Sequence, residues 1–274
     1  MEIRSHLEEA EGPRQEKRRF GARVIAYLGK GGTGKTVLSA LTAKLLISLA
    51  GRRLLLIDAD PVMGLSLALG LKATKTVGSV REAIVRETRA QKEGDRERLS
   101  MMFDYLLMEA LQEFPRFNLL VMGAMEGPGC YCPLNSLLRE GIEELAMNFD
   151  YIVIDAEAGI EQVSRQVTKR VDFPIMVTDS SWRGIATALS ISDALEKLEQ
   201  TPTRGVIFNR STAPDLSLKE QLARQGISCL GAVPEDQNIT RADLRGQSLL
   251  DLDSESPALA ALAQILGAAG IIGH

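Results

Sequence analysis

Residues 29 to 36 have the composition and spacing of a loop that binds phosphate. Four of the eight are glycines, and the stretch ends with a lysine and a threonine: Gly29-Lys30-Gly31-Gly32-Thr33-Gly34-Lys35-Thr36. Glycines allow successive backbone N–H groups to converge on phosphate oxygens, and a helix beginning near Lys35 would add the positive end of its dipole. We therefore expect Lys35 to contact the β- and γ-phosphates and the Thr36 hydroxyl to bind Mg²⁺. The alternative is a glycine-rich turn without a ligand, which the complete eight-residue pattern and its flanks disfavour.

Carboxylates follow two further apolar runs. The run 53–57 leads to Asp58 and Asp60, and the run 151–154 leads to Asp155. Both runs are typical of buried parallel strands, whose carboxyl ends lie where ligands bind in open α/β sheets. We expect Asp155 to hold Mg²⁺ through a water molecule. For Asp58 and Asp60, which precede a proline, an Asp-Pro turn is the alternative.

Two of the three cysteines, Cys130 and Cys132, are separated by one residue in a glycine- and proline-rich loop. A helix is expected to begin near Leu134, and a helix N-terminus favours thiolate. One such pair cannot complete a four-coordinate site, and the only histidines, His6 and His274, lie at the two ends of the sequence. Two loops facing each other in a symmetric dimer would supply four thiolates, which suit Zn²⁺, Ni²⁺ or an iron–sulfur cluster. The alternative is a pair of buried or idle cysteines, or a strained local disulfide.

The elements that would position these residues alternate between strand and helix, which predicts a doubly wound α/β fold with a mostly parallel sheet flanked by helices. Strands are expected at 24–28, 53–57, 118–122, 151–154, 173–178 and 205–209. Helices are expected at 37–50, 183–198 and 257–266, and two surface helices within 76–114. We expect Trp182, the only tryptophan, to pack at the edge of the core, with a contact to a partner as the alternative.

Length and charge limit the class of protein. A chain of 274 residues with 45% hydrophobic content can bury one large core. We expect a charge-dense, loosely packed extension at 1–22 and a single domain at 23–274. The net charge of −4 disfavours nucleic acid and membrane as partners. No apolar stretch reaches the length of a membrane span and the N-terminus has no apolar signal core, so a cytoplasmic protein is expected.

The string KGGTGKT resembles the deviant Walker A loop of a P-loop superfamily. That superfamily includes nitrogenase iron protein, the Min and Par positioning ATPases and metal-insertion ATPases. The resemblance implies a P-loop NTPase of the SIMIBI type that binds ATP and Mg²⁺ as a homodimer, with Lys30 reaching across the interface to the partner's nucleotide. Without it, Lys30 would be an ordinary solvated lysine. The resemblance also implies that Asp60 orients or activates water near the γ-phosphate, which makes Lys30, Lys35 and Asp60 the catalytic residues.

Further nucleotide contacts follow from the same resemblance. Gly159 would let the backbone approach the γ-phosphate. Asn209 would contact the base, since an amide offers the donor and the acceptor that the adenine edge requires. Pro234 and Asp236 belong to a stretch, 231–236, that resembles the loop closing over the base.

A narrower resemblance involves the cysteine loop. GPGCYCPLN, with the later string DAEAGIE, looks like the CooC-type nickel-insertion ATPases of carbon monoxide dehydrogenase and acetyl-CoA synthase maturation, from about residue 23 to about residue 266. It implies an ATPase that carries Ni²⁺, with Zn²⁺ as a competitor, to carbon monoxide dehydrogenase or a related nickel enzyme. Gly64 departs from the family, where a polar residue often approaches Mg²⁺ or phosphate, and this departure concerns the rate of hydrolysis more than nucleotide binding.

Two other classes of protein share the superfamily. An iron–sulfur electron donor like the nitrogenase reductase would place its two ligand cysteines far apart in sequence, whereas here they are one residue apart. A MinD/ParA-type positioning ATPase would need no Cys-x-Cys and would bind membrane or DNA through a basic tail or patch. The closing segment, 257–273, has no basic residue.

Overall fold

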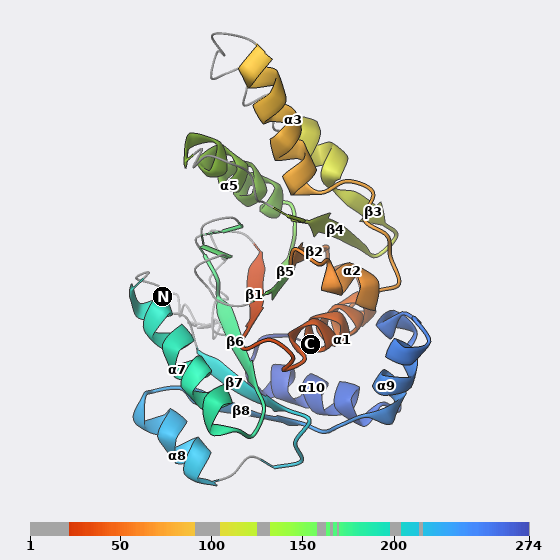
Figure 1. Ribbon diagram of the computed structural model, residues 1–274. Coiled ribbons are helices and arrows are strands. Elements are labelled where there is room, and N and C mark those ends of the chain that lie inside the picture. Colours follow the sequence, from red (N-terminus) through yellow and green to blue (C-terminus); the bar gives the residue numbers. More distant parts are fainter. Residues whose placement is uncertain are drawn as a thin grey trace, which may run out of the picture.

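The computed structural model describes residues 22–90, 105–124, 132–157, 163–164, 167–168, 170–197, 204–213 and 216–273 (Figure 1). Eight strands form one sheet in the order β3-β4-β2-β5-β1-β6-β7-β8. All neighbouring pairs are parallel except β3 and β4, which form an antiparallel hairpin at one edge. The strands are β1 Arg23–Leu28, β2 Leu54–Ala59, β3 Gln112–Phe114, β4 Phe117–Val121, β5 Tyr151–Ala156, β6 Phe173–Thr178, β7 Gly205–Asn209 and β8 Ser228–Val233.

Helices cover both faces of this sheet (Figure 1). One face packs against α3 Val77–Ala90, α5 Cys132–Ala146, α7 Trp182–Lys197 and α8 Leu216–Arg224. The other packs against α1 Lys35–Ser48, α2 Gly64–Ala68, α9 Gln237–Leu244, the 3₁₀ turn η1 Leu249–Asp251 and α10 Pro257–Ala268. The prediction of a doubly wound, mostly parallel sheet flanked by helices is therefore confirmed.

The central strands are apolar throughout because both of their faces are covered. In β1, Ile25 and Tyr27 contribute to the core beneath α1 and α10, whereas Ala26 and Leu28 contribute to the opposite core. This alternation follows from the two-residue period of a strand. The strands β2, β5 and β1 lie side by side in the middle of the sheet, and all of their residues except Arg23 are buried. Their carboxyl ends carry the loops in which the sequence predicts the site.

One expectation about local structure needs correction. Trp182 does not pack into the core: it is the first residue of α7, and 66% of its surface is exposed. Residues 112–114, for which no strand is expected from the sequence, form β3, which is antiparallel to β4. Phe114 and Phe117 stack with ring centroids 4.8 Å apart across that hairpin and stabilise it.

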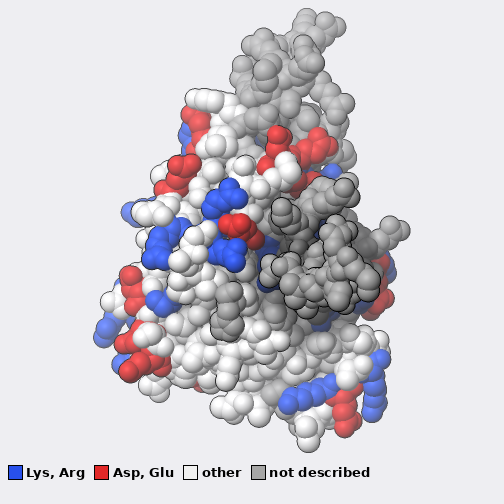
Figure 2. Space-filling model, turned by 180° about the vertical axis from the view of Figure 1, so that it is seen from behind, with Lys and Arg blue, Asp and Glu red and all other residues white. Residues whose placement is uncertain are grey.

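Charged side chains of both signs are interspersed over the described surface in Figure 2, in keeping with the mild net charge of the chain. Among the described helices, none is long and apolar enough to cross a membrane.

Candidate functional site

The glycines of the 29–36 loop are required by close backbone approaches. Gly29 has φ +138°, and a Cβ there would lie 2.4 Å from the carbonyl oxygen of Val177 on β6. Gly34 has φ +94°, and a Cβ there would lie 2.2 Å from Nδ2 of Asn209. Only glycine, which has no Cβ, tolerates both the positive φ and the close approach of these atoms. The loop is therefore held tightly against β6 and β7 from behind.

The front of the same loop is open. A Cβ at Gly31 or Gly32 would meet no other atom within 4 Å. Gly34 is the N-cap residue of α1 and provides no side-chain cap, so no side chain competes at Gly34 for the first N–H groups of the helix. Uncapped N–H groups at a helix start, next to open space, are suited to a phosphate group. The open front of the loop and the uncapped N–H groups of α1 are therefore the features that suit this loop to the phosphates of a nucleotide.

Lys35 lies over the loop that precedes it. Its Nζ donates a hydrogen bond to the carbonyl oxygen of Lys30, 3.2 Å away, and the Thr33 hydroxyl donates to the same oxygen at 2.9 Å. Burial lowers the pKa of Lys35, while the charges of Asp155, Asp60 and Glu157 oppose that shift. A buried ammonium beside the open glycine loop is suited to donate charge-assisted hydrogen bonds to phosphate oxygens. The Lys30 side chain itself is exposed.

Asp155 lies at the end of β5 and joins it to α1. Its Oδ2 accepts a hydrogen bond from the Thr36 hydroxyl at 2.7 Å, and its Oδ1 accepts one from the Ser39 hydroxyl at 3.2 Å. Burial raises the pKa of Asp155 to about 7. A hydroxyl and a carboxylate held together in this way are the oxygen ligands that Mg²⁺ prefers. Sequence reasoning missed Ser39, although its place three residues after Thr36 puts both on one face of α1.

The two aspartates after β2 have different surroundings. Asp58 is fully buried, and its Oδ2 accepts hydrogen bonds from both N and Oγ of Ser66 at 2.8 Å. Asp58 therefore fixes α2 to the sheet. Asp60 accepts a hydrogen bond from the N–H of Val62 through Oδ1. A Cβ at Gly64 would lie 3.8 Å from Asp60 Oδ2 and 3.4 Å from the Thr36 hydroxyl oxygen, so Gly64 leaves space between these two groups.

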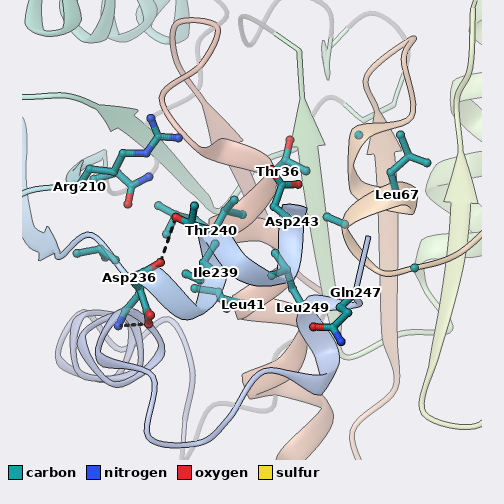
Figure 3. A pocket seen from close by; sticks show the side chains of 18 of the residues that line it. Thr36, Leu41, Leu67, Arg210, Asp236, Ile239, Thr240, Asp243, Gln247 and Leu249 are labelled. Carbon is teal, nitrogen blue, oxygen red and sulfur yellow. Dashed lines mark hydrogen bonds between the residues drawn. The ribbon is translucent and has the colours of Figure 1, made fainter. Parts of the chain in front are cut away.

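A cavity of about 810 Å³ extends from Thr36 along the top of α1, between α2 and α9 (Figure 3). Its walls combine apolar side chains such as Leu41, Ile239 and Leu249 with the loops that follow β7 and β8. Asn209, Pro234 and Asp236 all line it, so the structure brings the residues predicted to contact the base to one cavity beside the phosphate loop. Arg210 lines the same wall with its backbone in the left-handed region, at φ 55°.

Asn209 links this cavity to the phosphate loop. Its Nδ2 donates a hydrogen bond to the carbonyl oxygen of Thr33 at 2.8 Å, and the residue is almost fully buried. Because Thr33 presents an acceptor, the amide must direct its NH₂ toward the loop. The remaining Oδ1 is an acceptor, which matches the amino group of adenine better than the carbonyl group of guanine. The contact between Asn209 and a base stays a prediction, but the orientation of the Asn209 amide that would make it is now defined.

The carboxylate of Asp236 is engaged by the protein itself. It caps α9 by accepting a hydrogen bond from the N–H of Asn238 at 2.8 Å. Its Oδ2 accepts from the Ser256 hydroxyl at 2.5 Å and from the N–H of Ala258 at 3.4 Å, at the start of α10. Burial raises its pKa, but these hydrogen bonds outweigh burial and the pKa is lowered. Asp236 thus joins two helix starts to the loop that lines the cavity.

Some predicted site residues lie outside the described residues. Gly159 and Cys130 are among them. Cys132 is the first residue of α5, two residues earlier than the helix start expected near Leu134, and its side chain is not described. Within the described part of the chain, no three histidine, cysteine, aspartate or glutamate residues are grouped to hold a metal ion.

Comparisons with known proteins agree with this geometry. The family model described as "CobQ/CobB/MinD/ParA nucleotide binding domain" matches residues 24–250. An uncharacterized ATP-binding protein of Methanocaldococcus jannaschii is 38% identical over 235 residues, which is 84% of this chain and 91% of that protein. The carbon monoxide dehydrogenase accessory protein CooC of Rhodospirillum rubrum is 32% identical over 258 residues, 89% of this chain and 95% of that protein.

A solved structure has the same fold. The septum site-determining protein MinD of Pyrococcus horikoshii, complexed with Mg-ADP, superposes with a TM-score of 0.64 over 91% of this chain and 98% of that chain, at 23% identity. At this level of identity the likeness concerns the fold.

Proposed function

The chain belongs to the CobQ/CobB/MinD/ParA nucleotide binding domain family, and on that premise we propose that it is an ATP-dependent metallochaperone that inserts nickel. The family is one of P-loop ATPases, which the open phosphate loop and the Thr36–Asp155 pair suit. The proposal adds a cargo, Ni²⁺, and a client, carbon monoxide dehydrogenase or a related nickel enzyme. In this proposal ATP binding and release control a homodimer.

The observation that supports this cargo is the similarity to CooC, which extends over 89% of the chain, together with the Cys130-x-Cys132 pair. The pair follows β4, with Cys132 as the first residue of α5, and the carboxyl end of β4 faces the same edge of the sheet as the phosphate loop. Two subunits meeting through this edge would bring four thiolates together, enough for one soft metal ion. The ion would be cargo, held between subunits and released when the dimer opens.

Residues of the phosphate loop would hold the nucleotide for hydrolysis. The backbone N–H groups of 31–35 and the Lys35 ammonium would bind the phosphates, and Thr36 and Asp155 would hold Mg²⁺. Bound Mg²⁺ would neutralise phosphate charge. Asp60 lies close enough to Lys35 to influence its pKa, and in this proposal it orients the attacking water. Lys30, whose side chain is exposed, would reach the nucleotide of the partner subunit.

Hydrolysis could be linked to metal release through the sheet. The strands β4 and β5 both pair with β2, and they lead respectively to the cysteine loop and to the segment that contains Glu157. In this proposal a change at the γ-phosphate moves the segment after β5 and thereby loosens the dimer that holds the metal. The client enzyme would bind the reopening dimer.

The decisive experiment is an anaerobic titration with Ni²⁺ and Zn²⁺, followed by absorbance and by mass spectrometry under non-denaturing conditions. The double variant Cys130→Ser/Cys132→Ser is the control. We expect one metal per dimer and thiolate-to-metal charge-transfer bands, both lost in the variant. No binding, or equal binding by the variant, would overturn the metal cargo and leave an ATPase whose cargo is a protein.

Two other functions remain as alternatives with distinct outcomes. An iron–sulfur electron donor related to nitrogenase reductase would give a brown chromophore after anaerobic purification. A MinD/ParA-type positioning ATPase would co-sediment with liposomes or DNA in the presence of ATP, and we expect no such co-sedimentation. The family match itself includes MinD and ParA, so both assays belong beside the metal titration.

A further inference from the structure

Both carboxylate oxygens of Asp155 accept a hydroxyl hydrogen bond from the same helix. Thr36 donates to Oδ2 at 2.7 Å and Ser39 donates to Oδ1 at 3.2 Å. The donors are three residues apart on α1 and therefore lie on one face, toward β5. Two bonds to the two oxygens of one carboxylate fix its rotation as well as its position.

The two donors differ in their access to a ligand. Thr36 lines the cavity and is partly exposed, whereas Ser39 is fully buried and Asp155 is almost fully buried. Bulk solvent therefore does not reach Oδ1 in place of the Ser39 hydroxyl. Because Thr36 gives its proton to Asp155, the lone pairs of its own oxygen stay free for a cation. The Thr36 hydroxyl keeps this orientation only while Oδ2 of Asp155 stays within hydrogen-bond distance of it.

We propose that Ser39 is a positioning residue that holds the Asp155 carboxylate so that Thr36 presents its oxygen to Mg²⁺. The inference rests on the proposed nucleotide function, and it adds a residue that contacts neither the nucleotide nor the metal. Without Ser39, the carboxylate can turn and Oδ2 leaves Thr36. Nucleotide binding without Mg²⁺ would be nearly unchanged, because the N–H groups and Lys35 that bind phosphate are untouched.

The same helix provides a matched control. One turn further along α1, the fully buried Thr42 forms a hydrogen bond with the hydroxyl of Tyr27 on β1 at 2.5 Å. Thr42→Val and Ser39→Ala therefore each remove one buried hydroxyl that links α1 to the sheet. A purely structural role for Ser39 predicts that the two variants behave alike.

The test measures ADP affinity by calorimetry with Mg²⁺ and with EDTA for the wild type, Ser39→Ala and Thr42→Val. We expect Mg²⁺ to strengthen ADP binding in the wild type and in Thr42→Val. In Ser39→Ala that gain should fall by about tenfold, which is the size of a lost hydrogen bond to a charged group. ADP binding in EDTA should be equal in all three proteins.

A Ser39→Ala protein that keeps the full Mg²⁺ gain would overturn the inference while leaving the proposed function intact. A wild type that binds ADP without any Mg²⁺ gain would likewise overturn this inference alone. A wild type that binds no ADP, with Mg²⁺ or with EDTA, would overturn the proposed nucleotide function, and this inference with it. If Ser39→Ala does not fold, Ser39→Cys serves instead, since a thiol is a weaker donor of similar size. In Ser39→Cys the gain in ADP affinity from Mg²⁺ should be smaller than in the wild type, but reduced by less than about tenfold. A gain equal to that of the wild type would again overturn the inference.

Discussion

Asp236 should stabilise the fold more than it binds nucleotide. Asp236→Ala removes the N-cap of α9 and leaves the fully buried Ser256 hydroxyl without its acceptor. Loss of an N-cap costs about 1 kcal/mol, and a buried donor left unsatisfied costs about 1–3 kcal/mol. We therefore expect unfolding to require about 3 kcal/mol less than in the wild type. For a chain of this length that corresponds to a melting temperature lower by roughly 6–12 °C.

The effect of this substitution should depend on pH in a defined direction. The pKa of Asp236 is lowered in the folded protein, so the folded state favours the charged form more than the unfolded chain does. The stabilisation is therefore present above the ordinary aspartate pKa and is lost as the pH falls through the lowered value. We expect the difference in melting temperature between wild type and Asp236→Ala to narrow below about pH 4.

The assay is calorimetric melting at neutral pH with and without Mg-ADP. Because a ligand stabilises according to its concentration and Kd, an unchanged shift on adding Mg-ADP shows an unchanged affinity. Asp253→Ala is the control, since Asp253 accepts the N–H of Glu255 in an exposed turn before α10, and it should change the melting temperature little. An unchanged melting temperature in Asp236→Ala, with a Kd for Mg-ADP raised about tenfold or more, would refute the structural role and assign Asp236 to the ligand.

Gly34→Ala should weaken ADP binding by about tenfold or more in calorimetry, because φ is +94° and a Cβ would lie 2.2 Å from Asn209 Nδ2. Gly51→Ala, at φ +71° with no atom within 4 Å, should bind ADP as the wild type does. Asn209→Asp loses the donor to the Thr33 carbonyl, so it should bind ATP less tightly, and its free energy of unfolding should be lower by about 1–3 kcal/mol. An unchanged melting temperature together with an unchanged affinity for ATP would contradict this. Since burial raises the pKa of Asp155 to about 7, the folded ligand-free protein holds a proton that the unfolded chain has released, and stability falls as pH rises through that value. Relative to Asp155→Asn, the wild type should lose about 2 kcal/mol between about pH 5.5 and pH 7.5 in denaturant titrations, and parallel pH profiles would contradict the shift.

The parts of the fold that could be predicted from the sequence are those encoded by short segments. An apolar run followed by glycines, a lysine and a threonine predicts β1, the phosphate loop and α1 together, and the structure has them in that order. The place of Asp155 follows from the same logic, because parallel strands bring their carboxyl ends to one edge. The contact between Thr36 and Asp155 spans 119 residues of sequence, yet it needs only the order of two neighbouring strands.

The parts that could not be predicted depend on partners chosen by packing. Nothing in the sequence near Asp58 indicates that Ser66 would engage it, or that Ser256 would engage Asp236. Trp182 is apolar and lies three residues before the buried Ile185, which favours a core position. However, it is the first residue of α7, at the edge where the strands end, and most of its surface is exposed.

The hairpin of β3 and β4 has a consequence for how copies of the chain can meet. An open edge strand presents unpaired N–H and C=O groups to which another strand can add. Here one edge of the described sheet is the three-residue β3, turned antiparallel to its neighbour, and the other is β8, whose register with β7 shifts between Val206 and Ile207. Because β3 is short and the pairing of β8 is irregular, neither edge strand offers a long, regular row of backbone groups for pairing with a strand of another molecule. We therefore expect self-association of this chain to use side chains and loops, rather than a ladder of backbone hydrogen bonds running from one molecule into the next.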